Sequence, residues 1–264
     1  MRVLAIGDVC GSIGCRYAAR VLPRLRREEK IDFTVINGEN SADGNGITPQ
    51  SAEMLFACGA DVITGGNHSL RRKEVHSLLD ENPFLLRPEN IPASYGKGYA
   101  LVDTGRVRVA VWNLMGQAFL PNANAENPFL AADQLLERSR QDSARIILVD
   151  FHAEATGEKG ALAYYLDGKV SAVFGTHTHI MTNDARILPQ RTGYMTDLGM
   201  VGPAESVLGV VPTAVIGRLR GDETPEKWAL ADGPCQLSGC IFDVDTQNGM
   251  TTAIKPILIR EGQP

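Results

Sequence analysis

The sequence predicts a layered α/β/α fold with a mixed central sheet, formed as a single domain over residues 1–264. The first half alternates short apolar runs with amphipathic stretches, which is typical of parallel strands joined by helices. After about residue 185 the helical pattern fades, and short apolar runs indicate antiparallel strands. No repeat or linker divides the sequence, and its 264 residues suit one α/β domain.

The first predicted elements are a strand over 2–6, a helix over 14–30 and a strand over 33–36. Both strands are short apolar runs, whereas the helical segment carries Ala18, Leu22 and other apolar residues at helical spacing. Basic residues gather towards the end of that segment, as the C-terminus of a helix prefers.

Turn and cap residues define the next two elements, a helix over 49–59 and a strand over 61–64. Thr48 suits the N-cap of the helix, Pro49 its first turn and Gly59 its end. The further predictions, in chain order, are a helix over 71–80, a loop over 82–98, strands over 100–103 and 107–114, a helix over 131–140, a strand over 145–151, a helix over 161–166, and strands over 172–175, 211–219 and 239–244.

Composition limits the classes of function. The formal charge of -5 argues against broad binding to nucleic acids or acidic membranes, so we expect no extended nucleic-acid surface. The five cysteines form no CxxC pair, which indicates neither a disulfide framework nor a thiolate zinc site. The N-terminus leads directly into a strand-like run, and no stretch is apolar enough to span a membrane, so we expect a cytoplasmic protein.

Unusual polar side chains gather just past the ends of predicted strands, where an open parallel sheet forms its ligand crevice. They are Asp8, Glu39, Asn40, Asn67, His68, His152, His177 and His179. Four of the five histidines belong to this set, and His76, the fifth, is expected on the solvated surface. Carboxylates, amide oxygens and imidazoles together suit manganese, iron or zinc. The seven members of this set other than His68 exceed one tetrahedral site and suit two ions about 3.5–4 Å apart.

Each of these residues also has a simpler interpretation. A single histidine after a strand is more often structural, Asp8 alone suits a helix N-cap or turn, and Asn40 or Asn67 alone suits an Asx-turn. Their joint placement favours a metal site. Glycines after the first strand raise the alternative of a dinucleotide fold, but their spacing is GxxxGxxG rather than GxGxxG.

The motifs GDVCG, NGEN, GGNH, DFHAEATGEK and GTHTH resemble those of the calcineurin-like metallophosphoesterase superfamily, specifically its YmdB-like bacterial cyclic-nucleotide phosphodiesterase branch. The resemblance extends through RPENIP (87–92) and YMTDLGMVGP (194–203). It implies two metal ions, with iron or manganese favoured and zinc as an alternative, and it makes a homo-oligomer reasonable. The implied ligands are Asp8, Asn40 and His179 for the first ion, Asn67, His152 and His177 for the second, and Glu39 between them.

The resemblance leaves His68 free of metal and implies that it acts as the general acid. The sequence departs from the branch at Leu70 and Arg71, where relatives commonly carry an aromatic residue and an Asp, so the surroundings of His68 are expected to differ. Around His152, we expect supporting roles for Asp150, Glu154, Thr156, Glu158 and Lys159.

The resemblance implies a hydrolase of small phosphodiesters, with 2′,3′- or 3′,5′-cyclic nucleotides as substrates and a metal-bridged hydroxide as nucleophile. Two alternatives stay open from the sequence. The same ligands could serve a phosphomonoesterase, such as a nucleotidase or protein phosphatase. The chain could also be a non-enzymatic regulator that binds a nucleotide and uses its metals structurally.

Overall fold

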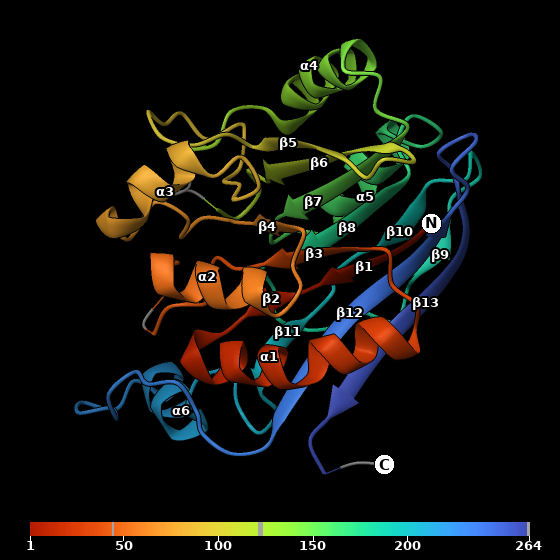
Figure 1. Cartoon of the computed structure of the whole chain (residues 1–264). Helices are drawn as coiled ribbons and strands as arrows, with labels where there is room; N and C mark the ends of the chain where they lie inside the picture. Colours follow the sequence, from red (N-terminus) through yellow and green to blue (C-terminus); the bar gives the residue numbers. More distant parts are fainter. Residues whose placement is uncertain (44, 121–123, 263–264) are drawn as a thin grey trace.

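Two mixed β-sheets pack face to face in the computed structural model, which describes residues 1–43, 45–120 and 124–262 (Figure 1). The strands are β1 (Arg2–Ile6), β2 (Asp8–Val9), β3 (Phe33–Asn37), β4 (Val62–Thr64), β5 (Tyr99–Asp103), β6 (Arg108–Met115), β7 (Ile146–His152), β8 (Ala172–Thr176), β9 (Arg186–Ile187), β10 (Gly193–Met195), β11 (Met200–Pro203), β12 (Cys235–Val244) and β13 (Thr251–Arg260). The helices are α1 (Gly11–Glu28), α2 (Pro49–Ala57), α3 (His76–Glu81) with the preceding 3₁₀ turn Lys73–Val75, α4 (Pro128–Gln141), α5 (Thr156–Tyr165) and α6 (Pro212–Arg220).

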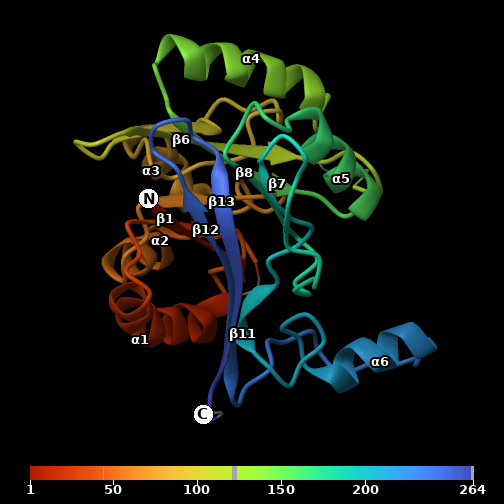
Figure 2. The same cartoon turned by 90° about the vertical axis from the view of Figure 1, so that its right-hand side faces the viewer.

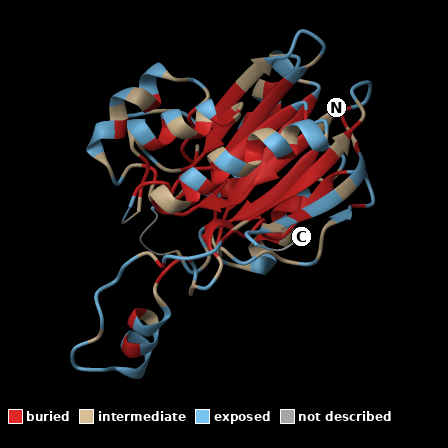
Figure 3. Ribbon diagram, turned by 60° about the horizontal axis from the view of Figure 1, so that its bottom comes forward, coloured by how far each residue is buried: buried red, intermediate tan, exposed pale blue. Residues whose placement is uncertain are grey.

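The first sheet has the strand order β2-β11-β12-β1-β3-β4, with β13 paired to β12, and the second has the order β5-β6-β7-β8-β10-β9. Helices α1 and α2 cover the outer face of the first sheet, and α4 and α5 cover that of the second (Figures 1 and 2). The buried strands therefore lie at the centre, and the outer faces of the helices meet solvent (Figure 3).

Alternation along the strands explains how three apolar cores form. In β1, Leu4 and Ile6 face α1 and α2, whereas Val3 and Ala5 face the other sheet. Successive strand side chains point to opposite faces, so a strand covered on both faces is apolar throughout. In the second sheet, Trp112 packs in the core beneath α4 and α5.

The predicted layered α/β class is confirmed, and the mixed strands form two sheets rather than one. The prediction of a strand over 211–219 is wrong, because these residues lie mostly in helix α6. β-Branched residues suggested a strand there, but Pro212 occupies the first turn of a helix and Gly221 ends it in the left-handed conformation, with φ of 78°. The helix expected over 161–166 begins earlier, at Thr156.

Helix α6 belongs to an extension formed by residues 204–232, which we call the arm. Its α6 end projects from the sheet layers (Figures 2 and 3). Two backbone hydrogen bonds close its base, from the N–H of Val211 to the carbonyl of Ala229 (3.0 Å) and from Ala231 to Gly209 (2.9 Å). Among the described residues, no helix is both long and apolar enough to cross a membrane.

The parallel strands bring the predicted site together. β1, β3 and β4 run parallel in the first sheet, as do β6, β7 and β8 in the second. Their carboxyl ends meet at one edge of the molecule, where the chain leaves each strand through a polar loop. The motifs that follow these strands therefore converge, although they are far apart in the sequence.

Candidate metal centre

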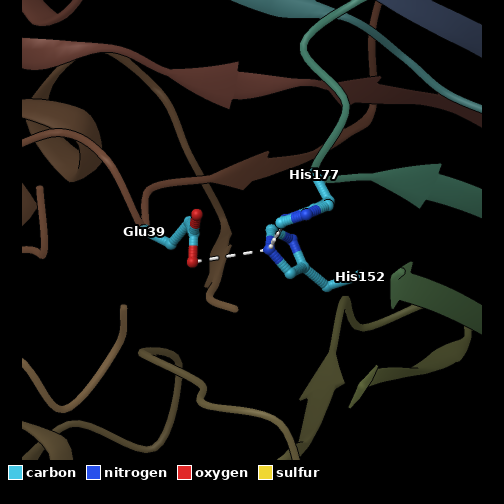
Figure 4. A group of neighbouring side chains, drawn as sticks. All are labelled: Glu39, His152 and His177. Carbon is cyan, nitrogen blue, oxygen red and sulfur yellow. Dashed lines mark hydrogen bonds and ion pairs between the residues drawn. The ribbon is translucent and has the colours of Figure 1, made fainter. Parts of the chain in front are cut away.

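Glu39, His152 and His177 form a compact group at the carboxyl ends of the strands. One ligand atom from each residue lies within 4.8 Å of the others (Figure 4). Glu39 follows β3, His152 is the last residue of β7 and His177 follows β8, so the group joins both sheets. Glu39 and His152 are almost completely buried.

The hydrogen bonds around Thr176 determine which nitrogen of His152 carries the proton. The Thr176 hydroxyl donates its hydrogen to Oδ1 of Asp150 (2.7 Å), so its oxygen must accept from Nδ1 of His152 (2.9 Å). Burial lowers the pKa of His152 to about 3, and a neutral ring with a proton on Nδ1 has a lone pair on Nε2.

That lone pair on Nε2 of His152 faces two acceptor oxygens and a ring nitrogen of His177. It lies 3.0 Å from Oδ1 of Asn67, 3.5 Å from Oε2 of Glu39 and 3.1 Å from Nδ1 of His177. A carboxylate, an amide oxygen and an imidazole lone pair repel one another unless a positive charge lies between them. This donor set suits a divalent transition metal.

The buried carboxylate of Asp8 is a second, independent indication that this cluster suits a cation. Its side chain is fully buried, and its Oδ1 has no hydrogen-bond partner among the described residues. Oδ2 accepts from the backbone N–H of His177 (3.0 Å), while Nδ1 of His152 and Nε2 of His179 lie 3.9 Å from Oδ1. Burial raises the pKa of Asp8 to about 8, because this carboxylate charge is poorly compensated.

His179 and Asn40 complete the same side of the cluster. Nδ1 of His179 lies 3.0 Å from the carbonyl oxygen of Leu208 in the arm and therefore donates to it. Nε2 is then the ring nitrogen that faces the cluster, and it lies 3.2 Å from the amide nitrogen of Asn40. A backbone carbonyl on the remote ring nitrogen is the usual support of a metal-binding histidine.

The local backbone is shaped for close approach. His177 and His179 have positive φ values of 101° and 63°, a conformation that is uncommon for non-glycine residues and is often found at functional sites. A Cβ atom at Gly66 would overlap the side chains of His152 and Glu39, so glycine is required there.

His68 borders the cluster with its side chain about one quarter exposed. Nδ1 lies 3.2 Å from Oε1 of Glu39 and 3.1 Å from Oδ1 of Asn40, and Nε2 lies 3.0 Å from Nδ2 of Asn67. Leu70 packs against the core beneath α1 and α2, and the backbone N–H of Arg71 donates to the carbonyl of His68. All eight predicted site residues thus lie together.

Residues around His152 have separate roles. Asp150 is fully buried, acts on His152 through Thr176 and also accepts from Asn37 (3.0 Å) and Thr64. Burial raises the pKa of Asp150 to about 6, although the hydrogen bonds from Thr64, Thr176 and Asn37 oppose this shift.

Three of the other residues expected to support His152 make distinct contacts. Glu154 lies 3.2 Å from Nε2 of His177, and Glu158 accepts backbone N–H groups of the loop after β6. Lys159 is buried, with its ammonium 2.7 Å from Asp197 and 2.9 Å from the carbonyl of Thr176. Thr156 begins helix α5.

Sequence reasoning missed several supporting residues. Asn37 and Thr64 end apolar strands, and Asp197 is buried in the segment between β10 and β11. A polar residue at the end of an apolar strand was the available signal. Cys10, which is not among the predicted site residues, has its buried Sγ 3.6 Å from Nδ1 of His179. His76 lies outside the cluster, half-buried and stacked on Tyr95 at a centroid distance of 4.5 Å, rather than fully solvated.

Comparison with known proteins extends these findings. A family model described as YmdB-like protein matches residues 4–257. The chain is 44% identical over 262 residues to the 2′,3′-cyclic-nucleotide 2′-phosphodiesterase of Bacillus subtilis strain 168, covering 99% of this chain and 98% of that protein.

Two solved structures are similar to this chain over nearly its whole length. A hypothetical protein of Thermus thermophilus is 39% identical with a TM-score of 0.89, and the match covers 99% of this chain and 100% of that one. A novel phosphatase of Mycoplasma pneumoniae is 31% identical with a TM-score of 0.92, covering 100% of this chain and 95% of that one.

Proposed function

Because the chain belongs to the YmdB-like family, we propose that it is a metal-dependent phosphodiesterase that hydrolyses cyclic nucleotides. The observation that carries the proposal is the convergence of oxygens of Asn67 and Glu39 on the Nε2 lone pair of His152, an arrangement that a bound cation would stabilise. The activity named for the Bacillus subtilis relative favours 2′,3′-cyclic nucleotides over 3′,5′-cyclic nucleotides.

We propose two metal ions, with iron or manganese favoured and zinc as an alternative. Their ligands would be Asp8, Asn40 and His179 for the first ion, Asn67, His152 and His177 for the second, and Glu39 for both. When bound, such ions lower the pKa of a water molecule and polarise the phosphoryl oxygens. The Oδ1 of Asp8, which has no hydrogen-bond partner among the described residues, and the Nε2 lone pair of His152 support this set, and Nε2 of His179 lies 3.9 Å from the same Oδ1.

His68 is proposed as the general acid for the leaving alkoxide. Its Nδ1 faces acceptors on Glu39 and Asn40 and so keeps its own proton. Nε2, which accepts from Nδ2 of Asn67 (3.0 Å) in this structure, is then the nitrogen that would take up a proton, leave that contact and deliver the proton to the leaving group. The partial exposure of His68 leaves it within reach of a substrate, as a general acid requires.

A second candidate function is phosphomonoester hydrolysis, because the similar Mycoplasma pneumoniae structure is described as a phosphatase. Metal-replete protein should be assayed in parallel on adenosine 2′,3′-cyclic monophosphate and adenosine 3′-monophosphate. The proposal expects faster turnover of the cyclic diester, with the 3′-monophosphate accumulating as product. Faster hydrolysis of the monoester would favour the phosphatase.

Glu39→Gln provides the matched inactive control, because it removes one charge from the cluster while keeping the side-chain size. Tight binding of the cyclic nucleotide without turnover would instead favour a non-enzymatic regulator.

Three wider proposals accompany this function. We propose that residues 1–264 form a single metallophosphoesterase domain, which the family match over 4–257 supports. A cytoplasmic location is supported by five free, buried cysteines, since thiols persist in reducing compartments. A homo-oligomer rests on the family resemblance alone, and light scattering on the purified protein would test it.

A further inference from the structure

Two neighbouring cavities open beside the cluster. The smaller, of about 330 Å³, is lined by Glu39, His68, His177 and other cluster residues. The larger, of about 480 Å³, extends from Asn40 and His179 towards the start of α1. The arm contributes Leu208, Val210 and Trp228 to both cavities, so they share one wall.

Trp228 is the unusual feature of that shared wall. Its side chain is 53% exposed, whereas Trp112, the other tryptophan, is completely buried. The guanidinium of Arg218 lies 5.1 Å from the centroid of the Trp228 ring, and this cation–π contact holds the ring from one face. An exposed, supported aromatic ring beside a catalytic cavity is suited to stacking on a flat ligand.

The charges of the larger cavity restrict what it can bind. Its ionisable lining consists of Arg16, Asp43 and Asp232, together with Cys10 and the proposed metal ligand His179. The two carboxylates outnumber the one guanidinium, so binding of a second phosphate group in this cavity is disfavoured. Apolar side chains, including Ile13 and Leu230, line the same space. The cavity therefore suits a neutral, flat group with polar edges, and its volume lies in the range of small-ligand sites.

We propose that the larger cavity is a nucleobase subsite in which the base of the substrate stacks on Trp228. This inference rests on the proposed function, because the phosphodiester would occupy the smaller cavity at the cluster. The substrate class is then a cyclic mononucleotide rather than the end of an oligonucleotide, whose next phosphate would meet the acidic lining. Purines, which present the larger π-face, are preferred over pyrimidines.

The test compares a substrate that has a base with one that lacks it. We expect Trp228→Ala to lower kcat/KM for adenosine 2′,3′-cyclic monophosphate by roughly 5- to 150-fold, the value of one base–aromatic stack. Glycerol 1,2-cyclic phosphate keeps the five-membered cyclic diester without a base, and its kcat/KM should fall much less, because it has no base to stack on Trp228. Trp228→Phe should restore most of the loss.

The matched control is Tyr164→Ala, which removes an aromatic residue of similar exposure, 57%, from α5. It should leave both substrates unaffected. The subsite proposal is overturned if Trp228→Ala lowers the two substrates equally or changes neither.

A binding measurement separates this proposal from the proposed function. Adenosine, which has no phosphate, should quench the fluorescence of Trp228 in the wild type, and the quenching should disappear in Trp228→Phe. If neither cyclic phosphate is hydrolysed but adenosine still quenches, the proposed function fails and the base subsite stands. If both are hydrolysed and adenosine gives no quenching, the subsite fails and the proposed function stands.

Discussion

Thr176→Val tests whether the hydrogen bond from His152 to Thr176 supports the metal binding proposed for His152. Valine matches the shape of threonine but has no hydroxyl, so Nδ1 of His152 would lose its acceptor and Oδ1 of Asp150 would lose its donor. Both residues are completely buried, and water cannot replace the lost partners without entering the core.

The expected loss of stability in Thr176→Val follows from these two unpaired groups. Each buried polar group left without a partner costs about 1–3 kcal/mol, so we expect a loss of about 2–6 kcal/mol in the free energy of unfolding. Asp150 keeps its contacts with Asn37 and Thr64, which favours the lower half of that range. Metal affinity should fall about 10- to 100-fold, because the ring of His152 is no longer held in the binding tautomer.

Urea unfolding of metal-free protein gives the stability, and competition with a chelator gives the metal affinity. Thr176→Ser is the matched control, since it keeps the hydroxyl and loses only a methyl group. The reasoning fails if Thr176→Val binds metal as tightly as Thr176→Ser does, because His152 would then not depend on this hydrogen bond.

Three further changes have defined outcomes. His68→Ala should retain its metals but lower kcat by about 10²- to 10⁴-fold, and loss of metal in elemental analysis would contradict its role as the acid. In metal-free protein, burial raises the pKa of Asp8 to about 8. The contribution of protonated Asp8 to the free energy of unfolding is therefore complete below the ordinary carboxyl pKa. It is lost as pH rises through about 8. Asp8→Asn should flatten this decline in urea unfolding, and an unchanged pH profile would refute the assignment. Gly66→Ala should abolish metal binding, because the added methyl overlaps His152, whereas Gly157→Ala, with open space around it, should bind normally in the same titration.

The parallel part of the fold could be predicted well from sequence because its signals are local. The strand at Arg2–Ile6 was predicted with the observed bounds, and the polar residues after each strand indicated the site edge. Their convergence follows from parallel pairing alone, since the carboxyl ends of such strands share one edge.

The remaining features depend on contacts between distant segments. Successive side chains of β1 and of β6 point alternately into two apolar cores. Any strand that is buried on both faces has this pattern, whether the fold contains one sheet or two. Apolar runs in the sequence therefore cannot reveal the second sheet. Helix α6 carries β-branched residues typical of a strand, and the caps at Pro212 and Gly221 outweigh them. The contact of Leu208 with His179 joins the arm to the cluster through a backbone carbonyl, for which a sequence has no signal.

The most direct test of the account measures metal content and phosphodiesterase activity on the same preparation. Elemental analysis should find about two transition-metal ions per chain, and bis(p-nitrophenyl) phosphate should be hydrolysed more rapidly with added Mn²⁺. Removal of metal with a chelator should abolish the activity, and Mn²⁺ should restore it. A chain that binds fewer than about two ions and hydrolyses no phosphodiester after Mn²⁺ is added would contradict the central claim.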